Sequence, residues 1–153
     1  MNLAIIPARG GSKRIKNKNI KLFMKKPIIY WSIKAVKESK LFDKLIVSTD
    51  SKKIKKICKK YKVDAPFTRP ASISKDNVGT AKVVKHALLW FKKKHKLHFD
   101  TVCCVYPASP FITGKIIKKG YNLINKRKKD FVFTVSTFPH PIERALKKIR
   151  MDL

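Results

Sequence analysis

Short, continuous apolar runs alternate with amphipathic segments along this chain, and this alternation restricts the possible folds more than any other feature. The runs are Leu3–Pro7, Leu45–Ser48, Thr101–Tyr106 and Phe131–Val135. A strand that is apolar at every position, rather than at every second one, is typical of a parallel sheet that is covered on both faces. The sequence therefore predicts an α/β fold with a mostly parallel sheet flanked by helices.

Four helices are expected between and after these strands. Their limits are Pro27–Lys40, Lys52–Tyr61, Ala81 to about Lys94, and a last helix that begins at Thr113. Pro27 suits the first position of a helix, and Ser51 and Thr80 are of the residue types that cap helix N-termini. The connection 62–78 is expected to be mostly irregular because it contains two prolines.

The segments that follow the strands hold the residues with the most distinctive chemistry. Ligands of open α/β sheets bind at the carboxyl ends of the strands. The segments at those ends are Arg9–Asn19, Thr49-Asp50, Pro107–Phe111 and Ser136–Arg144. We therefore expect a ligand site where these four segments meet.

The most informative stretch is the loop after the first apolar run, which covers residues 8–19 and reads ARGGSKRIKNKN. Its two glycines allow the backbone to approach a ligand closely. Its positive charge comes from Arg9, Lys13, Arg14 and Lys18. Together these features suit a polyphosphate, although the loop matches neither a Walker A nor a GxGxxG pattern. The alternative is an exposed loop that is basic only because the whole chain is rich in lysine.

The formal net charge of +29 also raises the question of nucleic-acid binding. Only six of the 38 basic residues are arginines, and the lysines are spread along polar helix faces, so a solvated surface accounts for most of them. Nucleic acid is therefore an unlikely partner, but the positive field would steer a triphosphate toward the protein.

Two further classes are disfavoured by composition. The three cysteines form no CxxC pair, so buried free thiols are expected rather than a zinc site. No apolar run is long enough to span a bilayer, and the first residues lack the pattern of a signal peptide. We expect a cytoplasmic protein with no membrane partner.

Four motifs in the same order resemble the CMP-sialic acid synthetase (acylneuraminate cytidylyltransferase) family. They are IIPARGGSKRIKNKNI at the start, LIVSTDS at Leu45–Ser51, RPASISKD followed by Gly79-Thr80, and VYPASPF at Val105–Phe111. The resemblance extends over nearly all 153 residues. It implies a Rossmann-like (GT-A-like) nucleotidyltransferase fold, with residues 1–153 as one nucleotide-binding domain.

The implied reaction is the transfer of CMP from CTP to a nonulosonic sugar acid, with release of pyrophosphate. Tyr106 stands where sialate enzymes of the family carry glutamine, and CCVYPASPF and FPHPIERAL (Phe138–Leu146) are more similar to the pseudaminic acid cytidylyltransferases. Pseudaminate is therefore the expected substrate. The alternatives are a CMP-sialic acid or CMP-KDO synthetase, and a non-catalytic basic fragment that binds nucleotide or RNA.

The resemblance also implies roles for single residues. The nucleotide-binding residues would be Ala8, Arg9, Gly10, Gly11, Ser12, Lys18, Asn19, Arg69 and Thr80. Of these, Arg9 and Lys18 would be catalytic, because they would neutralise the triphosphate. The sugar-binding residues would be Tyr106, Ser109, His140 and Arg144, and Arg144 would pair with the sugar carboxylate.

Several of these residues have plainer alternatives. Asn19 could be a turn or cap residue, Arg69 a loop ion-pair partner, and His140 a residue that only shapes its loop. Asp50 could contact the nucleotide or cap the next helix, and Asp76 could brace its own loop. The remaining histidines, His86, His95 and His98, are expected on a helix surface or in a loop, without a partner pattern.

The sequence departs from the family at its C-terminus. The family carries an Asp-Ile-Asp motif there that holds the catalytic Mg²⁺, and this chain has no Asp-x-Asp pair before Leu153. We expect the metal ligands to lie beyond Leu153, and the dimerisation arm of a homodimer to begin at about residues 138–153. On this interpretation the chain is a C-terminally truncated fragment with an incomplete fold, and we expect it to catalyse inefficiently as written.

Overall fold

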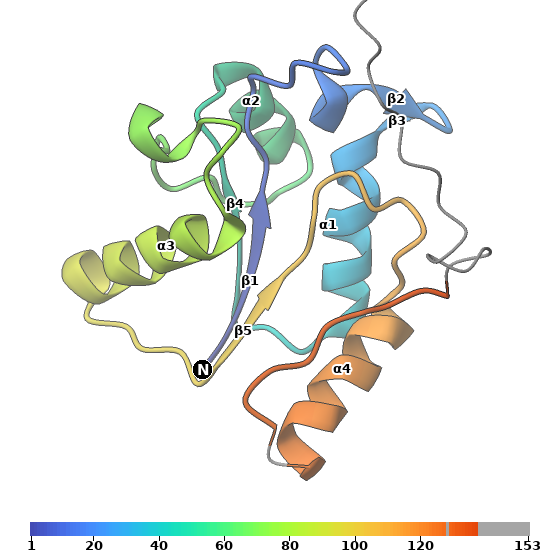
Figure 1. The fold of residues 1–153 in the computed structure, drawn as a ribbon, viewed down its shortest axis with the longest axis vertical. Coiled ribbons are helices and arrows are strands. Elements are labelled where there is room, and N and C mark those ends of the chain that lie inside the picture. Colours follow the sequence, from blue (N-terminus) through green and yellow to red (C-terminus); the bar gives the residue numbers. More distant parts are fainter. Residues whose placement is uncertain (128, 138–153) are drawn as a thin grey trace, which may run out of the picture. The chain divides into compact units, whose positions relative to one another are not determined.

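The computed structural model describes residues 1–127 and 129–137, which fall into two compact units, one of residues 1–119 and one that begins at Gly120. Figure 1 shows the order of the elements along the chain. They are β1 (Asn2–Pro7), η1 (Lys18–Ile20), β2 (Leu22–Phe23), β3 (Lys26–Pro27), α1 (Ile28–Ser39), β4 (Lys44–Ser48), α2 (Lys52–Lys60), η2 (Ala71–Ile73), α3 (Thr80–His95), β5 (Thr101–Cys104) and α4 (Gly114–Arg127). Helix α4 continues from the first unit into the second.

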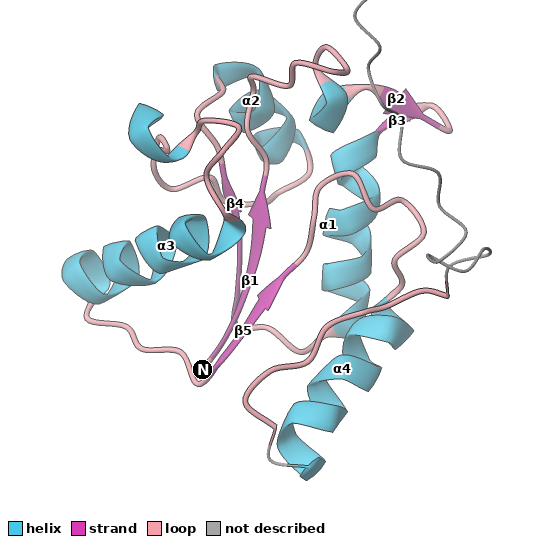
Figure 2. Cartoon of the chain, in the orientation of Figure 1, coloured by secondary structure: helices cyan, strands magenta, loops and turns pink. Residues whose placement is uncertain are grey.

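The central sheet has the order β4-β1-β5 and is parallel throughout, as the continuous apolar runs predicted (Figure 2). Strand β1 lies in the middle, where Ile5 is in register with Ile46 of β4 and with Cys104 of β5. Residues 3–6 of β1 are fully buried, because a central strand is covered on both faces. The carboxyl ends of β1 and β4 consequently open at the same edge of the sheet.

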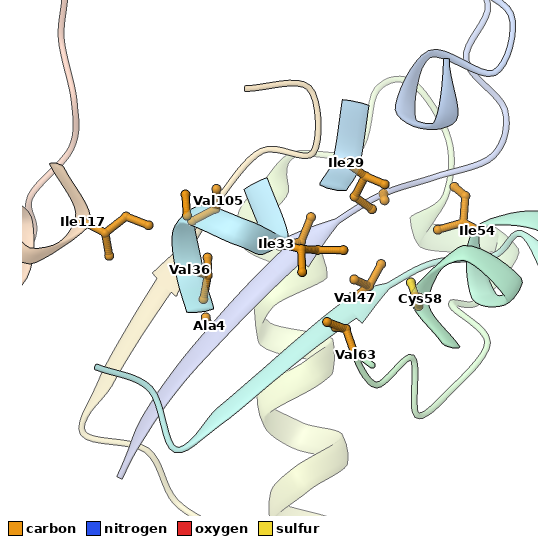
Figure 3. Close-up of a cluster of buried hydrophobic side chains, with 13 residues drawn as sticks. Ala4, Ile29, Ile33, Val36, Val47, Ile54, Cys58, Val63, Val105 and Ile117 are labelled. Atoms are coloured by element: carbon orange, nitrogen blue, oxygen red, sulfur yellow. The ribbon is translucent and has the colours of Figure 1, made fainter. Parts of the chain in front are cut away.

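Each face of the sheet has its own apolar cluster, because successive side chains of a strand point to opposite sides. On one face, Ala4 and Val47 pack with Ile33 of α1 and Cys58 of α2, as Figure 3 shows. On the other face, Leu3, Ile5 and Ile46 pack with Phe67 and with Ala87 and Phe91 of α3. The prediction of helices on both faces is therefore confirmed.

Helix limits agree with the sequence prediction to within a residue or two, but one expected cap is wrong. Ser51 caps α2, where its hydroxyl accepts a hydrogen bond from the amide of Ile54 at 3.4 Å. Thr80 does not cap α3, because Gly79 takes the cap position and Thr80 is the first helical residue. Its hydroxyl instead meets the hydroxyl of Tyr106 at 3.0 Å.

The prediction of a fourth strand at Phe131–Val135 is also wrong. Residues 131–137 are irregular, and Phe131, Phe133 and Val135 are largely exposed. The described part of the second unit, which holds the end of α4, contains no other strand with which this apolar run could pair. A strand needs a neighbour for its backbone hydrogen bonds, so the apolar pattern alone does not produce one.

Within the described ranges, no helix is long and apolar enough to cross a bilayer.

Candidate functional site

The first loop leaves the sheet beside the end of β4. In the parallel register Pro7 of β1 lies opposite Ser48 of β4, and the amide of Ala8 continues the ladder by donating to the Ser48 carbonyl at 2.9 Å. The loop therefore begins at a fixed position, fully buried at Ala8, and its basic side chains follow directly at the edge of the sheet. This is the edge at which parallel sheets bind ligands.

Gly10 is required because the loop passes close to the segment after β4. A Cβ atom at this position would lie 2.8 Å from Cβ of Ser51, which is closer than carbon atoms normally approach. The amide of Gly10 donates to Oδ1 of Asp50 at 2.8 Å. Ser51, and not Asp50, caps α2, and the Gly10 amide, which we expected to meet a ligand, is engaged with Asp50.

Gly11, unlike Gly10, has open space around it, and Ser12 contributes a hydrogen bond to the turn. A Cβ atom at Gly11 would meet nothing within 4 Å, so no close approach requires that glycine. The amide of Ser12 donates to the Gly10 carbonyl at 3.0 Å, which tightens the turn. Neither glycine has a positive φ, and the left-handed residue of this loop is Asn17, at φ 55°. The loop therefore uses its first glycine for space rather than for an unusual backbone angle.

Asn19 joins the two ends of the loop. It lies inside η1, is buried, and donates from Nδ2 to the carbonyl of Arg9 at 2.9 Å. Its Oδ1 is buried and has no hydrogen-bond partner among the described residues. Asn19 is thus a brace rather than a cap, and its carbonyl oxygen remains available to a donor. Lys18 begins the same turn and is half-buried.

An ion-pair bridge links the loop to the connection after η2. The guanidinium of Arg9 pairs with Oδ1 of Asp76, and Nζ of Lys13 lies 3.4 Å from Oδ2 of the same carboxylate. The hydrogen bond from Arg9 is the largest of the effects that hold the pKa of Asp76 below its usual value. One carboxylate therefore pairs with two of the cations that we expected to meet phosphate, and offsets one of their two charges.

Arg69 lies behind this loop at the end of β4. Its residue is only 4% exposed, its amide donates to the Thr49 carbonyl at 2.8 Å, and its Nη2 donates to the Ser48 carbonyl at 2.6 Å. Burial lowers the pKa of Arg69, the charge of Asp50 opposes that shift, and the charge of Arg9 adds to it. Arg69 is therefore not an exposed loop ion pair.

The other half of the expected site lies beyond β5 and is more open. Tyr106 is 59% exposed, and the hydroxyl contact with Thr80 ties it to the start of α3. Ser109 is half-buried in the following loop, where its carbonyl accepts from the amide of Ile112 at 3.2 Å. His140 and Arg144 lie outside the described residues.

The structure thus connects Arg9, Gly10, Asn19 and Arg69 around the tips of β1 and β4, and it connects Thr80 with Tyr106 beside β5. Sequence reasoning missed His86, which is half-buried on α3 and packs edge-on against Phe67 with ring centroids 4.9 Å apart. The sequence spacing could have indicated that His86 lies on the packed face of its helix. This face is formed by residues that follow the i, i+3, i+4, i+7 pattern, namely Val83, His86, Ala87 and Trp90.

A cavity of about 330 Å³ lies away from these residues, beside the start of β4. Its lining consists of Val36, Lys37, Lys40, Phe42, Leu45, Lys62, Val63 and Asp64. Substrate sites of α/β sheets open at the other end of the strands, and the buried polar groups converge there, so the strand tips remain the candidate site.

Comparisons with known proteins agree on one family. A family model described as Cytidylyltransferase matches residues 3–148. A pseudaminic acid cytidylyltransferase of Campylobacter jejuni is 38% identical over 144 residues, which is 94% of this chain and 62% of that protein. An N-acylneuraminate cytidylyltransferase of Escherichia coli O18:K1:H7 is 35% identical over 147 residues, covering 94% of this chain and 34% of that protein.

A solved structure shares the fold at low sequence identity. The structure of CMP:2-keto-3-deoxy-manno-octonic acid synthetase complexed with CTP superimposes with a TM-score of 0.67 and 20% identity, over 83% of this chain and 48% of that one. The expected nucleotidyltransferase fold is therefore confirmed. The chain spans about three fifths of the length of the Campylobacter relative.

Proposed function

The chain belongs to the cytidylyltransferase family, and from that premise we propose that it transfers CMP from CTP to a nonulosonic acid, with pseudaminate as the acceptor. The observation that supports this most directly is the meeting of Arg9, Asn19 and Arg69 at the tips of β1 and β4. This is the edge of a parallel sheet where a nucleotide is expected, and the three side chains offer the cationic and amide groups that a triphosphate and a base require.

In the proposed reaction the anomeric hydroxyl of the sugar attacks the α-phosphorus of CTP. A bond forms between that oxygen and the phosphorus, the bond from the phosphorus to the bridging oxygen of the β-phosphate breaks, and pyrophosphate leaves with the electron pair. The hydroxyl proton passes to solvent. Chemistry of this kind depends mainly on positioning and on charge stabilisation, which are the roles that we assign to Arg9 and Lys18.

Nucleotide binding would require a rearrangement at Arg9. Its guanidinium pairs with Asp76 in this structure, so an incoming triphosphate has to displace that carboxylate. The triphosphate carries several negative charges against the single charge of Asp76, so the exchange favours the nucleotide. The amides of the loop contribute less than the sequence suggested, because Gly10 and Ser12 already donate within the protein.

The acceptor would lie on the β5 side of the site. We assign Tyr106 and Ser109 to this half, together with His140 and Arg144, which lie outside the described residues. Sialate is the second candidate acceptor, because the N-acylneuraminate cytidylyltransferase of E. coli aligns with 94% of this chain at 35% identity. The tyrosine at position 106 favours pseudaminate, since the sialate enzymes of the family carry glutamine there.

The family resemblance implies Mg²⁺ as the cofactor, and this too is a proposal. Within residues 1–127 and 129–137, no group of three or more His, Cys, Asp or Glu side chains could hold a metal ion. The described residues therefore do not supply a metal site of their own, and we assign no step to one. A homodimer and a cytoplasmic location complete the proposal, and light scattering of the purified protein would test the dimer.

Two measurements test the proposed function. Calorimetry should show that the protein binds CTP in preference to ATP, and that replacing Arg9 by Met weakens CTP binding. Pyrophosphate release in the presence of CTP should then be faster with pseudaminate than with sialate or KDO. Equal affinity for ATP and CTP would contradict the nucleotide assignment, and faster turnover of sialate would replace pseudaminate as the acceptor.

A further inference from the structure

Three buried polar atoms behind the candidate site have no hydrogen-bond partner among the described residues. They are Arg69 Nε, Ser48 Oγ and His86 Nδ1. Buried polar atoms in folded proteins are nearly always hydrogen-bonded, so each such atom requires an explanation. Only Arg69 belongs to the nucleotide site that the sequence predicted.

The three atoms lie on the same side of the sheet. Ile46 packs in the cluster that contains α3, and side chains alternate along a strand, so Ser48 also faces α3. Phe67 belongs to this cluster, and Arg69 follows it by two residues and is buried like it. His86 extends from α3 and contacts the ring of Phe67 at an interplanar angle of 77°. His86 is also close enough to Arg69 for the guanidinium charge to act on it.

The hydrogen-bonding capacities of the three atoms are complementary. The Nε–H of arginine can only donate, the unprotonated nitrogen of a neutral imidazole accepts, and a serine hydroxyl does both. Burial lowers the pKa of His86, and the charge of Arg69 lowers it further, so the imidazole is neutral at pH 7. A neutral His86 is therefore a suitable acceptor beside a buried cation.

We propose that His86 is a positioning residue for Arg69, and that its neutral imidazole accepts a hydrogen bond that fixes the guanidinium toward the nucleotide. Because Arg69 Nε, Ser48 Oγ and His86 Nδ1 make no hydrogen bond to one another in the structure, the bond runs from Nε to Nδ1 through one water molecule, which can also bond Ser48 Oγ. The guanidinium is held at one end by the Ser48 carbonyl, and His86 fixes its orientation from the α3 side. This inference rests on the proposed function, because it assumes that Arg69 contacts CTP.

The proposed hydrogen bond to His86 depends on pH. Protonated His86 cannot accept the bond, and it places a second positive charge next to a buried arginine. The other charges that act on this pair are Asp50, after β4, and Arg9, after β1, and both act on Arg69. Because the folded-state pKa of His86 is depressed, the free energy of unfolding decreases as the pH falls below the ordinary histidine value of about 6.5, whereas the positioning of Arg69 weakens only as the pH falls through the lower folded value.

Two substitutions separate positioning from packing. His86→Phe keeps a ring against Phe67 but removes the acceptor, whereas His86→Gln keeps a polar acceptor that does not titrate. We expect His86→Phe to weaken CTP binding about 3- to 10-fold at pH 7.5, the value of one lost hydrogen bond, and His86→Gln to restore most of it. The control is His98→Gln, because His98 is exposed after the end of α3.

Calorimetric CTP titrations from pH 5.5 to 8 provide the second readout. CTP itself gains a proton in this range, so the pH profile of His86→Gln serves as the reference. Wild type should lose more affinity toward pH 5.5 than His86→Gln does. Identical profiles, or a His86→Phe protein that binds CTP as wild type does, would overturn the inference. If His86→Phe does not fold, the pH profiles of CTP affinity for wild type and His86→Gln are sufficient to test the inference.

A measurement without nucleotide keeps this inference distinct from the proposed function. The pKa of His86, followed by NMR, should rise in Arg69→Met, because the neighbouring charge is removed. A wild-type protein that fails to bind CTP would contradict the proposed function, and with it the nucleotide part of the inference, even if the NMR shift occurs. An unchanged His86 pKa in Arg69→Met would contradict the proposed interaction between His86 and Arg69, whether or not the protein binds CTP.

Discussion

The two halves of the candidate site are built differently. Around the tips of β1 and β4, polar side chains are fastened to the backbone: Asp50 accepts from Gly10, Asn19 donates to Arg9, and Arg69 donates to Ser48. Beside β5, the buried Ser32 donates to the Tyr106 carbonyl at 2.8 Å, but the side chain of Tyr106 is mostly exposed and its hydroxyl meets that of Thr80. Apart from Arg9, whose guanidinium pairs with Asp76, the polar side chains of the first half are therefore positioned before any ligand arrives, whereas the exposed side chain of Tyr106 has more freedom to adapt.

This difference matches the demands of the proposed chemistry. A triphosphate requires charges at fixed positions, and preorganised groups lose no free energy in reorientation when the reaction occurs. An acceptor half that is open to solvent can change between relatives without disturbing the sheet. The comparison therefore predicts that substitutions in the first half cost stability and nucleotide affinity, while those in the second half act on the acceptor sugar.

The largest effect is expected at Gly10. Gly10→Ala places a methyl group 2.8 Å from Cβ of Ser51, so the loop has to shift away from β4. We expect a loss of about 1–3 kcal/mol in the free energy of unfolding, as for other overpacked sites, and a clear loss of CTP affinity. Urea unfolding and calorimetry measure the two effects.

Gly11→Ala is the matched control for this change. A Cβ atom there meets nothing within 4 Å, and the position has no positive φ, so the free energy of unfolding should stay within about 0.5 kcal/mol of wild type. Equal losses in the two variants would show that the loop is not held against β4, and the contrast between the two halves would disappear.

A smaller loss is expected at Asn19. Asn19→Ala removes the hydrogen bond to the Arg9 carbonyl, and it also removes a buried Oδ1 that has no partner among the described residues. The net change in the free energy of unfolding should be about 1 kcal/mol, because one buried hydrogen bond is lost. The exposed Asn77 provides the control, and Asn77→Ala should unfold like wild type in urea. An Asn19→Ala protein as stable as wild type would argue that the loop is fixed by Gly10 alone.

Removal of the ion-pair bridge between Arg9, Lys13 and Asp76 should change CTP affinity more than it changes the free energy of unfolding, because exposed ion pairs stabilise a fold only slightly. Asp76→Asn removes the carboxylate that occupies both cations, so CTP no longer has to displace it, and the affinity should rise several-fold. The pKa of Asp76 is depressed in the folded state, so its contribution to stability is present above the ordinary pKa of 3.8 and is lost only as the pH falls through the lower folded value.

Asp64→Asn is the control for Asp76→Asn, because it removes the same charge from an exposed position beside the cavity at the start of β4. Its CTP affinity should change little. If Asp64→Asn tightens CTP binding as much as Asp76→Asn does, the effect comes from net charge and the bridge has no particular role. Weaker binding by Asp76→Asn would instead mean that Asp76 helps to position Arg9.

The sequence predicted the fold well where a local pattern and the tertiary structure demand the same conformation. The apolar runs became β1, β4 and β5, although β5 ends at Cys104 and is half-buried rather than buried, and Ser51 caps α2 as its residue type suggests. The run Phe131–Val135 did not become a strand, because a strand depends on a neighbour that its own residues do not specify. Thr80 has the chemistry of a cap, but Gly79 holds that position, and the Thr80 hydroxyl contacts Tyr106 instead, a partner that is distant in sequence.

The candidate site was predictable in part for the same reason. The motif loop begins directly after β1, as predicted, so Arg9 lies close to the end of that strand, and Asn19 in η1 is tied back to Arg9 by a hydrogen bond, while the nucleotide-binding roles of both stay predictions. Asp50 and Asp76 were harder to place, since each contacts a residue that is far away in sequence. His86 was missed because its contacts are with Phe67 and Arg69, which lie in the connection between α2 and η2 and not on its own helix. Contacts of this kind follow from the assembled sheet and not from local spacing.

The smallest stability effect is expected in the open half of the site, and it is the most direct test of the contrast. Thr80→Val and Tyr106→Phe each break the hydroxyl contact, and the partner left behind is solvated, so the free energy of unfolding should change by less than about 0.5 kcal/mol. The two changes share one contact, so the double variant should be no less stable than the worse single one. In turnover assays we expect the KM for the sugar acid to rise in Tyr106→Phe while the KM for CTP stays constant. A KM for CTP that rises as much as that for the sugar would contradict the assignment of Tyr106 to the acceptor half alone, because only a residue that both substrates contact would weaken the binding of both together.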